Sequence, residues 1–111
     1  MNPAIAKLGH TTRQVALFAL IGLTTPALAD LKELTEKNGC AGCHKMDKKI
    51  FGPSFKEIAT KYKGDAAAPA ALVNSVKKGS NNAWGDKRQM PPQEAAPEGE
   101  VKQIIALILA L

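Results

Sequence analysis

Two cysteines, Cys40 and Cys43, are the only ones in the 111-residue chain, and His44 follows them directly. This spacing is typical of c-type haem attachment, in which two thiols add across the haem vinyl groups and the adjacent imidazole reaches the iron. The two thiols that hold the haem and the imidazole that ligates it then lie within about one helical turn of each other. The motif therefore predicts a domain built around one covalently bound haem c.

The first 29 residues have the layout of a secretory signal peptide. Lys7, His10 and Arg13 precede an unbroken apolar run from Val15 to Leu23, and the small-residue stretch 27–29 follows. Such a layout predicts export and cleavage after the small residues. The apolar run of nine residues is well short of the roughly 20 that span a bilayer, so a signal peptide is favoured over a membrane anchor and the expected location is the periplasm.

Cleavage after Ala29 would leave residues 30–111, a single monohaem domain of 82 residues with no membrane span. A side-chain core is marginal at this size, so the haem should supply core and the apo chain should fold poorly. Loss of Lys7 and Arg13 lowers the formal charge from +5 to +3, and the remaining basic residues are spread along the chain. Nucleic acid is therefore not an expected partner.

Other uses of two thiols and an imidazole have to be weighed against haem attachment. A zinc site needs about four ligands, yet removal of His10 leaves only Cys40, Cys43 and His44 in the mature chain. A thioredoxin-like dithiol belongs in a βαβ context, and the sequence has no strand pattern. A simple disulfide stays open in an oxidising compartment, although it gives His44 no role.

Hydrophobic periodicity predicts an all-α domain of about four helices and no β-strand. Asp30 and Glu33 have the spacing of a capping box for the first helix, and Gly39 can end it. The last helix carries an apolar stripe. The expected helices lie at about 31–38, within 54–64, at about 68–78 and within 98–111.

Residues 79–97 read as one long, proline-containing loop, and Met90 lies within it, followed by two prolines. A thioether on the far side of the haem would stabilise ferrous iron. Met1 leaves with the signal peptide, and Met46 is too close to His44 along the chain to reach the opposite face. Met90 is therefore the expected second axial ligand, and a methionine that fills a gap in the core is the alternative.

Four segments of the mature chain together resemble the small bacterial class I cytochromes c of the c-551/c-552 type. They are NGCAGCH, KKIFGPSFKEIATKYKG, VKKGSNNAWG and QMPP, in that order. The resemblance implies the all-α cytochrome c fold, with the first and last helices crossing. It implies thioether bonds at Cys40 and Cys43 and axial iron ligands at His44 and Met90.

The resemblance also implies two supporting contacts. The carbonyl of Pro53 would accept the Nδ1 hydrogen of His44 and so fix the orientation of the ring. Trp84 would pack at the haem edge and donate its indole hydrogen to a propionate. Two features depart from the family pattern: four residues, not three, separate Gly85 from Met90, and Gln93 stands where a ligand-supporting Asn is common.

The function implied is one-electron transfer by a soluble, monomeric protein that transforms no substrate. Its partners would be respiratory redox proteins, a cytochrome bc1-type donor and a terminal oxidase or reductase as acceptor. A haem enzyme or gas sensor would need an open distal position, which Met90 argues against, and a subunit of a larger complex is a third possibility. The basic residues expected near the haem edge are Lys37, Lys45, Lys48, Lys49, Lys77, Lys78, Lys87 and Arg88, which would steer an acidic partner.

Overall fold

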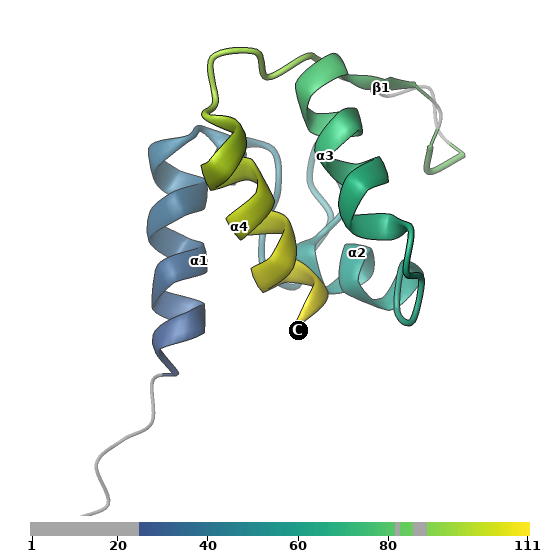
Figure 1. The fold of residues 1–111 in the computed structure, drawn as a ribbon. Helices are drawn as coiled ribbons and strands as arrows, with labels where there is room; N and C mark the ends of the chain where they lie inside the picture. Colours follow the sequence, from purple (N-terminus) through teal and green to yellow (C-terminus); the bar gives the residue numbers. More distant parts are fainter. Residues whose placement is uncertain (1–24, 82, 86–88) are drawn as a thin grey trace, which may run out of the picture.

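The computed structural model describes residues 25–81, 83–85 and 89–111, in which four α-helices dominate (Figure 1). The predicted all-α fold is confirmed. Across these residues no helix is both long and apolar enough to cross a membrane. Most of the expected signal peptide, residues 1–24, lies outside the described part. The elements are α1 (Pro26–Lys37), η1 (Cys40–Gly42), α2 (Phe55–Lys61), α3 (Ala68–Lys78), β1 (Ser80–Asn81), β2 (Gln89–Met90) and α4 (Glu98–Leu109).

The first helix begins earlier than its sequence predicts. α1 starts at Pro26. Proline suits the first turn of a helix, because an N–H at that position has no partner within the helix. Asp30 therefore lies inside the helix, and the prediction that it caps a helix over 31–38 is wrong for this chain, because the preceding residues are helical as well. The end is as predicted: Asn38 is the C-cap, and Gly39 has φ +76°.

The second helix carries the capping box that the first lacks. The Ser54 hydroxyl accepts a hydrogen bond from the N–H of Glu57 at 3.0 Å, and the Glu57 carboxylate accepts one from the N–H of Ser54 at 2.7 Å. Both donors would otherwise be left unpaired at the helix start. α2 ends at Lys61, ahead of Gly64, and α3 occupies the range predicted for it.

The hydrophobic core lies where α1, α2 and α4 meet, and α1 packs along α4 (Figure 1). Leu31 of α1 is 1% exposed and belongs to one cluster with Phe55 and Ala59 of α2 and with Ile104 and Ile108 of α4. Full burial of such a side chain stabilises the fold by about 1.5–3 kcal/mol. The apolar stripe predicted for the last helix is thus the face that closes the core.

A short antiparallel pairing interrupts the predicted loop. Ser80 pairs with Met90 and Asn81 with Gln89, so the prediction of no strand is wrong here. A two-residue strand is too short to leave an alternating pattern in the sequence. The pairing joins the two ends of the segment between Asn81 and Gln89.

A polar link also joins the end of α1 to the start of α4. The Glu100 carboxylate accepts hydrogen bonds from the ammonium of Lys37 and, at 2.8 Å, from the side-chain amide of Asn38. The bonds from Lys37 and Asn38 hold the pKa of Glu100 below its ordinary value. The same bond to Glu100 raises the pKa of Lys37.

We expect Glu100→Gln to lower the thermal unfolding midpoint of the haem-loaded protein by a few degrees near neutral pH. Because the pKa of Glu100 is depressed in the folded state, its carboxylate stabilises the fold above about pH 4.5 and loses this effect as pH falls through the folded-state pKa. Melts at about pH 7 and about pH 3 measure the difference. Glu98→Gln is the control, since Glu98 pairs with Lys102 within α4, and an equal loss there would contradict the inter-helix role.

Candidate haem-binding site

The Cys-X-X-Cys-His motif is folded by one tight turn at the end of α1. Gly39 turns the chain with a left-handed φ of +76° into η1. The N–H groups of Cys43 and His44 then both donate to the carbonyl of Cys40, at 3.1 and 3.0 Å. Both cysteines are free. The turn therefore brings two thiols and an imidazole to the wall of a single hollow.

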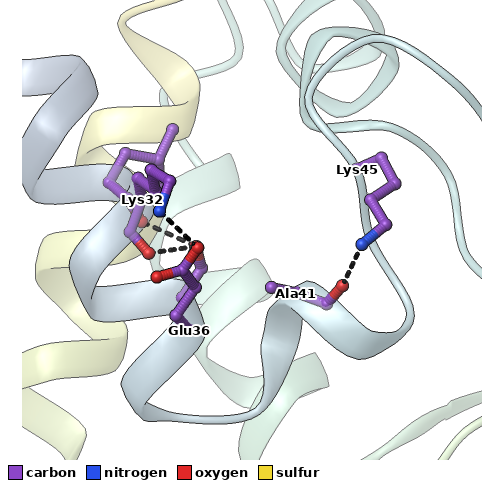
Figure 2. Close-up of polar contacts among 6 residues, drawn as sticks. Lys32, Glu36, Ala41 and Lys45 are labelled. Atoms are coloured by element: carbon purple, nitrogen blue, oxygen red, sulfur yellow. Dashed lines mark hydrogen bonds and ion pairs between the residues drawn. The ribbon is translucent and has the colours of Figure 1, made fainter.

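A lysine supports the same turn from outside. Figure 2 shows the Lys45 ammonium directed at the carbonyl of Ala41, a hydrogen bond of 3.0 Å. Lys32 and Glu36 form a separate pair on the exposed face of α1 (Figure 2). Lys45 is thus engaged by the motif itself, and its charge lies next to the two cysteines.

The imidazole of His44 is confined by three neighbours. Its Nδ1 atom lies 2.7 Å from the carbonyl oxygen of Pro53, the contact that the resemblance implies. A carbonyl oxygen only accepts, so Nδ1 carries the hydrogen and Nε2 keeps the lone pair that a metal needs. The ring stacks on Phe55 with a centroid distance of 5.7 Å and an interplanar angle of 23°, and Gly52 lies against it.

Gly52 is the third neighbour, and the sequence alone gave it no separate role at the site. A Cβ atom at this position would lie 2.6 Å from Cε1 and 2.8 Å from Nδ1 of His44. The Gly52 N–H donates to the carbonyl of Cys43 at 2.8 Å, which holds the loop against the motif. A glycine before a proline signals a turn, but the close approach to the imidazole depends on the folded chain.

We expect Gly52→Ala to displace the His44 ring or the loop and to destabilise the protein by about 1–3 kcal/mol, as overpacking does. Denaturant unfolding of the haem-loaded protein measures the loss. Gly99→Ala is the matched control, because a Cβ there meets nothing within 4 Å and alanine favours a helix. Equal stability of the Gly52→Ala protein and the parent would contradict the packing described.

The hollow behind the motif brings the predicted site residues together. It has a cavity volume of about 160 Å³ and is open at its mouth. An apolar hollow of about 70 Å³ continues from it toward the core and shares Met90 and His44 with it. Met46 instead packs against the hydrophobic core. The predicted residues that line the first hollow are Cys40, Cys43, His44, Pro53, Trp84 and Met90.

Trp84 lies at one edge of this hollow and is held by the end of α2. The Lys61 ammonium lies 4.3 Å from the centroid of the Trp84 ring and donates to the carbonyl of Ala83 at 2.6 Å. Tyr62 meets the indole edge-on, with ring centroids 6.5 Å apart. The Lys61 and Tyr62 contacts were not predicted from the sequence, because they join residues more than 20 positions apart.

The side chains around the hollow fit a covalently held haem. Two thiols, an imidazole and a thioether are the groups that attach and ligate haem c, and the remaining wall is largely apolar. Burial raises the pKa of the Cys40 thiol, whereas a redox dithiol requires a lowered one. Among the described residues no three His, Cys, Asp or Glu side chains group into a metal site.

Comparison with known proteins agrees with this geometry. The model of a family described as cytochrome c oxidase, cbb3-type, subunit III matches residues 26–108. Cytochrome c-551 of Allochromatium vinosum is 40% identical over 94 residues, which cover 85% of this chain and 98% of that protein. Cytochrome c-552 of Hydrogenobacter thermophilus is 33% identical over 99 residues, 89% of this chain and 98% of its own. The crystal structure of Nitrosomonas europaea cytochrome c552 superposes with a TM-score of 0.69 at 34% identity, covering 72% of this chain and 98% of that one.

An all-α domain with a Cys-X-X-Cys-His turn at the wall of an apolar hollow defines a c-type cytochrome, and the chain belongs to the cytochrome c family. Within that family its relatives are the small cytochromes c-551 and c-552. These proteins bind one covalent haem c and carry electrons; they are not enzymes. The predicted fold, family and cofactor are therefore confirmed.

Proposed function

We propose that the protein is a periplasmic one-electron carrier whose haem c is tethered by Cys40 and Cys43 and ligated by His44 and Met90. The observation that carries this proposal is the single hollow lined by all four side chains. Its partners would be respiratory redox proteins, with a cytochrome bc1-type donor and a terminal oxidase or reductase as acceptor. Because His44 and Met90 would fill both axial positions of the haem, a haem enzyme or gas sensor is not favoured.

The chain's own residues set how such a carrier works. The haem, when bound, supplies the one-electron couple between ferric and ferrous iron. Pro53 and Phe55 fix the imidazole of His44, so the proximal ligand has little freedom to move when the charge on the iron changes. Trp84, held by Lys61, would donate its indole hydrogen to a haem propionate. A site this constrained should exchange electrons with little rearrangement.

The mouth of the hollow is the proposed contact surface for a partner. Phe51 lines it and is 73% exposed, which offers an apolar contact beside the exposed Cys43. Lys48 and Lys49 are exposed and precede Phe51 in the chain, and their charges would attract an acidic partner. The predicted charge at Lys37 forms an ion pair with Glu100. The predicted charges at Lys87 and Arg88 lie outside the described residues.

Expression in a bacterium with a haem c maturation system tests the proposal. The periplasmic fraction should contain a protein that begins at Asp30, has the mass of residues 30–111 plus one haem, and shows a single reversible one-electron wave in voltammetry. A protein that retains residues 1–29, or one found in the cytoplasm, would contradict the periplasmic assignment. A wave of different electron number would contradict the carrier role.

The same preparation tests the positive contact surface. Oxidation of the ferrous protein by the ferricyanide anion should slow as salt is raised, since exposed charges are screened within about 10 Å at 0.1 M. Lys48→Gln with Lys49→Gln should reduce this salt dependence. Lys102→Gln removes a charge on α4, where Glu98 is its partner, and should leave the dependence nearly unchanged. Equal effects per charge removed would indicate net charge alone.

A further inference from the structure

Lys77 lies in the last turn of α3, and its ammonium is directed at a single stretch of backbone. It donates to the carbonyls of Ala96 at 2.6 Å, Glu94 at 2.9 Å and Gln93 at 3.4 Å. An ammonium has three donors and no acceptor, so its whole donor capacity is used on one segment. Hydrogen bonds from a charged donor are about twice as strong as neutral ones. The half-buried Lys77 is therefore a structural contact, in contrast to the exposed rim charge that the sequence suggested.

The stretch that Lys77 holds begins three residues after Met90. Pro91 and Pro92 have no N–H and cannot anchor the backbone by donating. The first N–H beyond Met90 belongs to Gln93, and it donates to the carbonyl of Val76 at 2.9 Å. A backbone bond and the Lys77 ammonium thus attach this stretch to the same turn of α3.

Met90 itself and Gln89 before it are held by the residues that follow α3, since Asn81 pairs with Gln89. Gly79 has φ +81°, and a Cβ atom there would lie 2.8 Å from the carbonyl oxygen of Met90. Ser80 pairs with Met90 in the short β-ladder. Two attachments therefore hold the chain around Met90 to the end of α3. One is the short β-ladder, and the other is formed by residues 93–96, where Lys77 makes the main side-chain contribution.

We propose that Lys77 is a positioning residue for Met90, which keeps the thioether sulfur at the haem iron by fixing the segment that follows it. This inference rests on the proposed ligation by Met90. Lys77 touches neither hollow, so it acts through the backbone of residues 93–96. Its loss should make dissociation of Met90 from the iron easier without removing the ligand itself.

Imidazole competition on the ferric, haem-loaded protein tests the inference, since imidazole binds only where the methionine has left the iron. We expect Lys77→Met to raise the apparent affinity for imidazole about tenfold, as follows from the loss of charge-assisted hydrogen bonds. Lys78→Met is the matched control, because it removes the same charge from the adjacent, exposed residue. Lys77→Arg keeps a multiple donor and should remain closer to the parent than Lys77→Met.

A Lys77→Met protein that binds imidazole as the parent does would overturn the inference. So would equal increases in the Lys77→Met and Lys78→Met proteins, because these would reflect charge alone. A purely structural role would lower the unfolding midpoint and leave the imidazole affinity in native buffer unchanged. If Lys77→Met does not fold, Lys77→Gln gives the same test with a smaller expected increase. Absence of the ferric methionine–iron charge-transfer band in the parent itself would instead show that the proposed ligation had failed.

Discussion

Replacement of Met90 by alanine should turn a ferrous protein that does not bind carbon monoxide into one that binds it readily at neutral pH. Met90 lines both hollows, and alanine has no atom that can reach the iron. Loss of the soft ligand should also lower the reduction potential by on the order of 0.1 V or more, within the range of about 0.8 V that axial ligation covers. Carbon monoxide titration and voltammetry measure the two effects.

Met46→Leu is the control for this experiment. Met46 packs against the hydrophobic core, so a change of similar volume should cost less than about 1.5 kcal/mol of stability and leave the iron ligands unaltered. The potential and the inertness to carbon monoxide should be those of the parent. A Met90→Ala protein that remained inert to carbon monoxide, with the parent's potential, would rule Met90 out as the ligand.

Joint replacement of Cys40 and Cys43 by alanine should abolish covalent haem attachment and most of the helical structure of the isolated chain. The side chains that face the two hollows come from α2, α3, α4 and the loops, and haem would be their shared apolar contact. Only eight hydrophobic residues are buried among those described, which is a small core for four helices. Denaturing gel electrophoresis with haem staining and far-ultraviolet circular dichroism measure the two losses.

The single variants Cys40→Ala and Cys43→Ala are the controls for the double change. Each keeps one thiol, and each should retain one thioether bond and a folded, less stable protein. A double variant that showed the parent's helical spectrum without haem would contradict the account. It would mean that α1, α2 and α4 form a sufficient core by themselves.

Local signals in the sequence predicted the parts of the fold that depend on local energetics. α3 was predicted over its full length, because Pro69 in the first turn and Gly79 at the end mark its limits. The stripe of α4 was predicted, since a 3.6-residue period requires no knowledge of its neighbours. The start of α1 was missed: Asp30 is a good cap only where the preceding residues are not helical. The β-ladder was missed because two residues show no alternation.

The candidate site also has a part that the sequence predicts and a part that it does not. The continuous motif predicted Cys40, Cys43 and His44, and elimination among three methionines predicted Met90. The contacts that hold these residues could not be predicted. Gly52 contacts the imidazole of His44, and Lys77 binds the segment after Met90, only once the chain has folded. An ordinary lysine at a helix end gives no sign of which carbonyls its ammonium will reach.

The most direct measurement is the proton–carbon NMR spectrum of the ferrous protein with ¹³C-labelled methionine methyl groups. When the sulfur of a methionine binds haem iron, the methyl group of that methionine lies over the porphyrin ring, and the ring current shifts its resonance far upfield. Ligation by Met90 predicts one strongly upfield methionine methyl in the mature protein, retained in Met46→Leu and lost in Met90→Ala. A spectrum without an upfield methionine methyl, or one in which that signal disappears with Met46 instead, would contradict ligation of the haem by Met90.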